Sequence, residues 1–279
     1  ISYQIIITTL FQYVVDQFGM DHDTVYGTKF TIFQAVPTAI LVLFPLSMKR
    51  DMSAFRYVSI ASILGLLYTG IVMGIDLPGY YSENSPTAEK AAFYLDLNMF
   101  TGCSMTFFAF QCQVQLLPIY SELVNPEYRR VSKVIERAIG VDFFFYFSIA
   151  IIGYFSTFDK TATIVLERDP IPGRGTDYPI LIAIMSIIVC VLVAFPMAYS
   201  PFRQQFFIIF AKRENGQFSG KENFLVTSIF IVVSMVISIM FPHIDKVIAI
   251  MGGLCAVTMD FLIPVYCYVK LSGKPWTSC

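Results

Sequence analysis

Long apolar stretches recur along the chain and are separated by short polar segments. Each stretch holds about 20 mostly apolar residues, which is the length of an α-helix that crosses the hydrocarbon core of a bilayer. The apolar residues are continuous and do not alternate with polar ones, so the pattern favours helices over the strands of a membrane barrel. It predicts eight transmembrane helices: Ile1–Phe18, Phe30–Met48, Ala54–Ile75, Leu97–Tyr120, Ala138–Thr157, Tyr178–Ser200, Phe224–Phe241 and Val247–Leu271.

The eight segments are expected to form one bundle. No Ser/Gly-rich linker, charge run or visible repeat divides them, so we expect an all-α polytopic membrane protein with a single transmembrane domain over residues 1–279. When alternate loops are assigned to two sides, thirteen of the nineteen Lys and Arg residues fall on one side. Because positive loops stay on the cytoplasmic side, both ends of the chain are predicted to lie there.

Composition supports a membrane protein and excludes several other classes. Hydrophobic residues make up 56% of the chain and charged residues 14%, with a mean hydropathy of +0.65. A net charge of −1 gives no basic surface for nucleic acid, and no Gly-rich phosphate loop or zinc-like spacing is present, so no cofactor or metal is expected. His22 and His243 fall in outer-side loops without a nucleophile or carboxylate pair nearby, which argues against an enzyme.

The fourth apolar stretch has an unusual polar interior. Phe107–Leu123 reads FFAFQCQVQLLPIYSEL, with Gln111, Gln113 and Gln115 within five residues and Pro118 shortly after. Polar side chains at mid-depth and a proline that lacks a backbone donor are typical of an interrupted helix that binds a ligand. The alternative is a proline-kinked helix whose glutamines hydrogen-bond to neighbouring helices.

Three acids lie inside or at the edges of the predicted spans. Asp16 and Asp142 are close to helix ends, where interfacial water reaches them. Asp260 falls about halfway along the last helix, where an ionised carboxylate is disfavoured by at least ~2.5 kcal/mol. Asp260 is therefore expected to be protonated, paired or exposed to a wet cavity, either as a proton or cation relay or as a neutral acid bonded to a neighbouring helix.

Small residues and prolines mark two further places. Gly252, Gly253 and Ala256 permit close helix packing, with backbone access for a ligand as the alternative. Pro196 and Pro201 free backbone carbonyls that either face a cavity or accompany a simple kink near the helix end.

Cysteines and glycosylation acceptors help to predict which cellular membrane holds the protein. Five of the six cysteines lie inside apolar segments and the sixth is terminal, so they are interpreted as buried small hydrophobic residues. No usable Asn-x-Ser/Thr acceptor occurs, because Asn84 is followed by Ser85 and Pro86. An intracellular membrane, mitochondrial inner or vacuolar/lysosomal, is therefore favoured over the plasma membrane. The sequence starts at Ile1 without an initiator Met and is expected to be a fragment.

Motifs spread over the chain resemble the amino acid/auxin permease family, specifically its sodium-coupled neutral amino acid transporter branch. The similarity lies in the order and spacing of several short motifs, each of which is weak alone. They are FPLSMKR at Phe44–Arg50, FAFQCQVQLLPIYSEL at Phe108–Leu123, the basic loop with Asn125, Pro126, Arg129, Arg130 and Val131, GYFSTF at Gly153–Phe158, PMAYSPFR at Pro196–Arg203, and Met251–Leu271.

The resemblance implies an inverted-repeat (LeuT-like) transporter bundle. In that fold the first and sixth of eleven helices are unwound around a site at the membrane midplane. With the fourth stretch as the sixth helix, this chain corresponds to helices three to ten, and the first, second and last family helices have no counterpart. The implied substrate-binding residues are Phe108, Ala109, Phe110, Gln111, Cys112 and Gln113.

Two departures from the family pattern concern coupling. Gln113 and Val114 replace the family's His-Pro, and Ala194 stands where sodium-coupled members carry a threonine. A methyl group cannot ligate sodium, so proton coupling through Asp260 is favoured over sodium coupling.

Two functions of different classes remain open. The first is an alternating-access amino acid transporter in a lipid bilayer. The second is a transporter-derived accessory subunit of a larger membrane assembly, such as a respiratory complex, in which other membrane subunits are partners and transport is lost.

Overall fold

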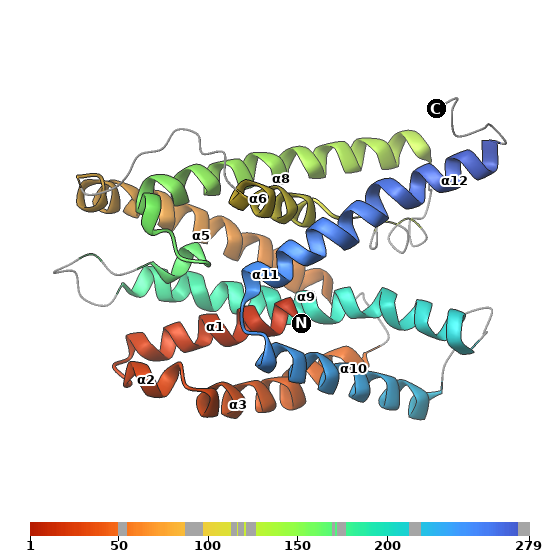
Figure 1. Ribbon diagram of the computed structural model, residues 1–279, viewed down its shortest axis with the longest axis horizontal. Coiled ribbons are helices and arrows are strands. Elements are labelled where there is room, and N and C mark those ends of the chain that lie inside the picture. The colour runs from red at the N-terminus through yellow and green to blue at the C-terminus, as the bar shows by residue number, and fades with distance from the viewer. Residues whose placement is uncertain are drawn as a thin grey trace. The chain divides into compact units, whose positions relative to one another are not determined.

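All regular structure in the described part of the chain is helical. The computed structural model describes residues 1–49, 55–86, 97–112, 116, 120, 127–168, 171, 177–211 and 219–272. Figure 1 shows the long helices. The elements are α1 (Ser2–Gln17), α2 (His22–Val25), α3 (Thr28–Pro37), the π-helix η1 (Thr38–Leu43), α4 (Phe44–Met48), α5 (Phe55–Asn84), α6 (Leu97–Ala109), α8 (Tyr128–Thr157), the short 3₁₀ turns η3 (Phe158–Lys160) and η4 (Val165–Glu167), α9 (Tyr178–Ala211), α10 (Gly220–Met240), α11 (Ile244–Ile250), the π-helices η5 (Met251–Ala256) and η6 (Thr258–Leu262), and α12 (Ile263–Ser272).

Six helical stretches within the described residues are long and apolar enough to cross a membrane. They are Thr28–Met48, Tyr57–Asn84, Tyr128–Lys160, Tyr178–Phe210, Gly220–Met240 and Ile244–Ser272. The other two predicted spans correspond to shorter helices, α1 with 16 residues and α6 with 13. Large apolar side chains stay exposed on these helices, for example Leu64 at 63% and Ile75 at 71%. An integral membrane protein exposes such side chains to lipid.

Several helices extend beyond the predicted apolar spans. The helix predicted at Ala54–Ile75 continues to Asn84, and the one predicted to begin at Ala138 begins at Tyr128. The helix with Pro196 and Pro201 continues to Ala211, so neither proline accompanies a kink at its end. Hydropathy detects the apolar part of a helix, whereas backbone hydrogen bonding continues into its polar flanks.

Contacts divide the chain into two compact units. The first comprises Ile1–Lys90 and Phe143–Pro242, and the second comprises Ala91–Asp142 and His243–Cys279. Within the first unit, α9 packs against both α5 and α1, and α10 packs against α1, α3 and α4. Within the second unit, α6 packs against α11 and η5.

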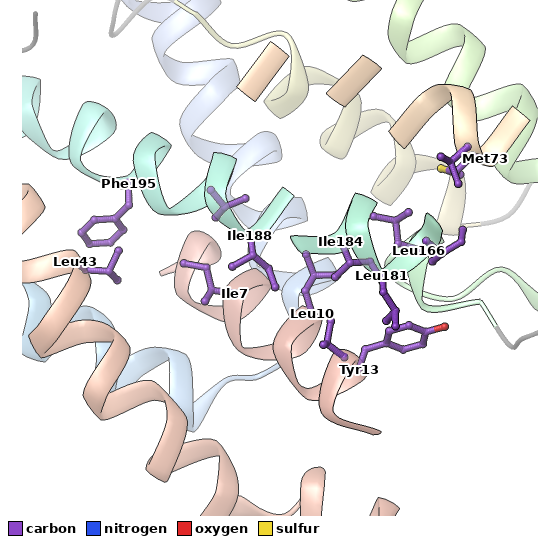
Figure 2. Close-up of a cluster of buried hydrophobic side chains, with 14 of the residues drawn as sticks. Ile7, Leu10, Tyr13, Leu43, Met73, Leu166, Leu181, Ile184, Ile188 and Phe195 are labelled. Carbon is purple, nitrogen blue, oxygen red and sulfur yellow. The ribbon is translucent and has the colours of Figure 1, made fainter. Parts of the chain in front are cut away.

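The core of the first unit forms where α1, α5 and α9 meet. Leu10 and Ile184 are fully buried, as is Leu43 of η1. Figure 2 shows these side chains together with others of the same cluster, including Ile7, Ile188 and Phe195. Their burial fixes α1 against the middle of α9 through apolar contact.

Arg203 of α9 fastens the end of α4 within this unit. Its side chain is 1% exposed, and its Nη1 donates to the Ser47 carbonyl at 2.8 Å and to Asn223 Oδ1 at 3.1 Å. Nη2 donates to the Lys49 carbonyl at 3.1 Å, and Asn223 Nδ2 donates to the Met48 carbonyl at 3.4 Å. The last carbonyls of a helix lack intrahelical donors, so Arg203 and Asn223 cap α4 from two other helices.

Backbone contact joins α6 and η5 within the second unit. Gly252 is buried against the Ser104 carbonyl, so close that a Cβ added to Gly252 would overlap the carbonyl oxygen. The rings of Phe107 and Phe261 meet edge to face beside this contact, with centroids 6.3 Å apart. Ala256 is also fully buried, so the close packing expected of these small residues is present at Gly252 and Ala256.

We expect Arg203→Met to lower the free energy of unfolding by about 3 kcal/mol, because three acceptors, two of them buried, lose a charged donor. Thermal unfolding in detergent measures the change. The control is Arg130→Met: the Arg130 side chain is 70% exposed and pairs with Glu127 at 3.6 Å, so its loss should have little effect. Equal melting temperatures for the two variants would contradict a capping role for Arg203.

A second prediction concerns the glycine between α6 and η5. Gly252→Ala should lower the melting temperature, because the new methyl group forces the two backbones apart. Gly102→Ala, in α6 itself, is the matched control, since a Cβ at Gly102 meets no atom within 4 Å. If Gly252→Ala is as stable as Gly102→Ala, the close contact does not hold α6 in place.

Candidate functional site

The helix α6 ends inside the apolar stretch that sequence analysis singled out. Its last residue is Ala109, Phe110 forms a turn, and Gln111 and Cys112 are not helical. The predicted interruption therefore begins where the glutamines begin. Gln113, Gln115 and Pro118 lie outside the described residues.

The backbone hydrogen bonds define the break. Phe110 N–H donates to the Thr106 carbonyl at 3.2 Å, as in an α-helix, but Gln111 N–H donates to the Phe108 carbonyl at 3.2 Å, which is the tighter 3₁₀ spacing. Helical spacing returns at Leu116, whose N–H donates to the Cys112 carbonyl at 3.1 Å. The regular ladder is thus interrupted between Phe110 and Cys112.

A helix that ends in this way presents backbone charge to a ligand. The carbonyl groups of the last turn carry a partial negative charge, worth roughly half an elementary charge for a whole helix end. The carbonyl end of α6 therefore faces the break with the polarity that attracts an ammonium group or another cation. No catalytic side chain is required for such binding.

The predicted substrate-binding residues are consecutive at this break. Phe108, Phe110 and Gln111 are half-buried, and Ala109 and Cys112 are exposed. Phe108 also lies against the η5 backbone, since its Cβ is 3.2 Å from the position of a Cβ built on Gly252. The contact between α6 and η5 thus supports the helical turn that precedes the break.

Asp260 lies in the π-helix η6, two residues beyond Thr258. Its side chain is half-buried, and its Oδ1 is buried without a hydrogen-bond partner in the described part of the chain. Wide π-turns are rare and occur often at functional sites. The neighbouring Phe261 ring contacts Phe107 of α6, so Asp260 belongs to the same packed group of elements as the break.

The remaining predicted residues belong to other elements than α6. Asp142 is exposed and Asp16 is half-exposed, as expected for acids that reach interfacial water. Ala194 belongs to α9 in the first unit and is half-buried. His22 forms a ring contact with Tyr26, with centroids 4.5 Å apart.

A buried ion pair was missed by sequence analysis, which counted Arg168 as an ordinary loop cation. Arg168 is 3% exposed and Asp76 is 7% exposed, and their Nη2 and Oδ2 atoms are 3.5 Å apart. The guanidinium also stacks 3.9 Å from the centre of the Tyr80 ring, and Tyr13 Oη donates to the Arg168 carbonyl at 3.1 Å. The pair fastens the segment after η4 to α5 and α1.

Glu167 and Tyr26 have perturbed protonation near this segment. Burial raises the pKa of Glu167 to about 7, so its carboxyl group is partly protonated at neutral pH. Burial, followed by the negative charges of Glu167 and Asp16, raises the pKa of Tyr26 to about 12. Burial is the main cause of the raised Tyr26 pKa, and the two nearby acids add to it.

Metal-type clusters are absent from the residues that the structure describes. No group of three or more His, Cys, Asp or Glu side chains converges there. Cys103 and Cys267 are exposed and Cys190 and Cys255 are half-buried, without a disulfide. The expectation that the cysteines are buried is therefore wrong for three of them, Cys103, Cys112 and Cys267.

Comparisons with known proteins identify relatives along the whole chain. The family model described as transmembrane amino acid transporter protein matches residues 1–279. Sodium-coupled neutral amino acid transporter 7 of Xenopus laevis is 26% identical over 259 residues, which cover 87% of this chain and 53% of that protein. The putative sodium-coupled neutral amino acid transporter 11 of Homo sapiens is 28% identical, over 99% of this chain and 66% of that protein.

These relatives are longer than the chain. It spans about half the length of the frog protein and about two thirds of the human one. No solved structure matches the chain significantly. The matching family is one of transporters and not of enzymes, in agreement with the expectation from the sequence. Because the family model covers all 279 residues, the chain belongs to the transmembrane amino acid transporter protein family.

Proposed function

We propose that the chain is part of a membrane transporter that carries amino acids by alternating access and binds them at the break in α6. The observation that carries this proposal is the end of α6 at Ala109, inside an apolar segment of a chain from an amino acid transporter family. The end of a helix at membrane depth supplies backbone partial charge, where a charged substrate needs partners and water is scarce. Phe108, Ala109, Phe110, Gln111, Cys112 and Gln113 are the proposed binding residues.

An amino acid suits this site because it carries a positive charge. Its ammonium group would lie at the carbonyl end of α6, where the helix dipole is negative. Gln111 would add a side-chain contact, while Phe108 and Phe110 would cover the apolar part of the substrate.

For coupling, we propose a proton carried by Asp260. The support is its position in a π-helix and its buried Oδ1 without a partner in the described residues. The relatives are named as sodium-coupled transporters. Ala194 stands where those proteins are expected to carry a threonine, and its methyl group cannot ligate sodium. Protonation of Asp260 would neutralise the one acid near mid-depth of its span.

The wider architecture is also proposed from the family. The chain would supply eight transmembrane helices, the third to tenth of an eleven-helix inverted-repeat (LeuT-like) bundle, and behave as one transmembrane domain over residues 1–279. The remaining helices would come from other parts of the protein. Its partners would be lipid and an amino acid, and an intracellular membrane is favoured because the chain has no usable glycosylation acceptor.

The alternative is an accessory subunit that has lost transport. Two observations favour it: the replacement of the family's His by Gln113, and Ala194 in the sodium position. An inherited break in a helix would then be structural only.

Uptake of amino acids into proteoliposomes distinguishes the transporter hypothesis from the accessory-subunit hypothesis. The full-length protein is expected to accumulate labelled neutral amino acids under an inward proton gradient, and Asp260→Asn should abolish this accumulation without changing thermal stability. Asp142→Asn, at an exposed acid of α8, is the control and should transport normally. Unchanged uptake by Asp260→Asn would remove Asp260 from coupling. If neither a proton nor a sodium gradient drives uptake, the transporter reading fails.

A further inference from the structure

A pocket with many polar side chains lies between α1, the α2–α3 segment and α10, all within the first unit. Its volume is about 260 Å³. Seven of its ten lining residues carry a hydroxyl or amide group, although membrane-type helices surround it. The lining residues include Thr8, Thr9, Gln12, Thr28, Thr31 and Ser238.

Three hydroxyl groups of this pocket use their hydrogen within the protein and can therefore only accept a hydrogen bond or metal contact from a ligand. Thr9 Oγ1 donates to the Ile5 carbonyl at 2.9 Å, Thr31 Oγ1 to the Gly27 carbonyl at 3.2 Å, and Ser238 Oγ to the Met235 carbonyl at 2.8 Å. Each hydroxyl has one hydrogen and uses it within its own helix or turn, so its remaining lone pairs are left for other partners. The pocket is therefore rich in oxygen acceptors.

Gln12 adds a carboxamide with the same bias. It is 6% exposed, and its Nε2 donates to the Val25 carbonyl and to Thr31 Oγ1, both at 3.0 Å. With both N–H groups of the amide engaged, Oε1 is the atom of this side chain that is left to bind a ligand.

Beneath the pocket lies a second buried amide. Gln4 is 6% exposed, and neither its Nε2 nor its Oε1 has a hydrogen-bond partner. It lines a small cavity of about 10 Å³, close to the minimum for one water molecule, and Thr8 and Ser238 line both this cavity and the larger pocket. A buried amide without hydrogen-bond partners destabilises the fold by roughly 1–3 kcal/mol. This cost indicates that a polar molecule, such as water, binds to Gln4.

Two acidic side chains, Asp16 and Glu167, lie near the mouth of the pocket. Tyr26 lines the pocket, and after burial, which is the main cause, both acids contribute to its raised pKa. No Lys or Arg is among the described lining residues; Lys29 follows the lining residue Thr28 in α3 but is itself exposed. Acceptor oxygens near two acids, with no Lys or Arg in the described lining, favour a cation over an anion.

We propose that this pocket binds a hydrated monovalent metal cation, Na⁺ or K⁺. Neutral amide and hydroxyl oxygens are hard ligands suited to such an ion, and the lining lacks the carboxylates that a divalent ion requires. A water molecule occupies about 30 Å³ in the liquid, so the pocket holds the ion together with several of its waters. The ion enters beside Tyr26 and Thr28, on the side that the Lys and Arg distribution assigns as outer.

This site is independent of the proposed transport, because it lies in another unit than α6 and is tested by binding alone. Binding of ²²Na⁺ to the purified full-length protein in nanodiscs, with choline replacing sodium at constant ionic strength, should be saturable. Unlabelled Na⁺ and K⁺ are then compared as competitors to identify the preferred ion.

Two pocket variants and one control locate the ion. Thr9→Val removes a lining oxygen and should weaken binding about fivefold or more, whereas Thr28→Asp adds a carboxylate at the mouth and should tighten it about tenfold. Thr69→Val is the matched control: Thr69 also donates to the carbonyl four residues before it, at 2.9 Å, but does not line the pocket. Its binding should equal that of the unmodified protein.

Three results would overturn the proposal. One is the absence of saturable binding of either ion, which would mean that the pocket holds water only. Another is binding that Thr9→Val and Thr28→Asp leave unchanged, which would place the ion elsewhere. The third is an equal loss in Thr69→Val. If Thr9→Val does not fold, the gain expected for Thr28→Asp decides alone.

Discussion

Lipid cannot form hydrogen bonds with a protein backbone, and this constraint explains the most distinctive parts of the structure. Every N–H and C=O group inside a membrane must find a partner in the protein, so an interrupted helix is tolerated only where protein or a polar cavity supports it. The end of α6 at Ala109 therefore requires support. Direct backbone packing at Gly252 holds α6 against η5 just before the break.

The same constraint governs charged groups in the first unit. Arg203 is buried because the last carbonyls of α4 need donors, and Asn223 of α10 completes the arrangement. Arg168 is buried against Asp76 and the Tyr80 ring. These two contacts join segments that are far apart in the sequence, and they leave the helix faces outside the core apolar, as lipid requires.

Much of the fold followed from the sequence because lipid imposes a simple rule on composition. All-helical structure and the integral membrane character were predicted correctly, and six of the eight predicted spans qualify by length and apolarity. The place where α6 ends was also visible, because three glutamines in an apolar run are hard to accommodate in a regular span. Helix ends were predicted less well, since polar flanks such as Tyr128–Arg137 are helical without being apolar.

The sequence did not predict which residues pair with one another. Arg168 and Arg203 appear as loop cations in a linear reading, because their acceptors are 92 and 156 residues away. The polar pocket was missed as well. Gln4 and Gln12 are eight residues apart and thus lie on one face of α1, which is a signal that a search for polar residues within spans would have found.

The central claim is that the break in α6 receives an amino acid, and alkylation of Cys112 tests it directly. Cys112 lies at the break with an exposed side chain, whereas Cys103 is an exposed cysteine of α6 nine residues earlier. Two variants that each keep one of these cysteines are treated with a small maleimide, with and without saturating neutral amino acids. The account predicts that amino acids slow the labelling of Cys112 several-fold and leave Cys103 unchanged. Equal labelling rates of Cys112 with and without every amino acid tested would contradict it.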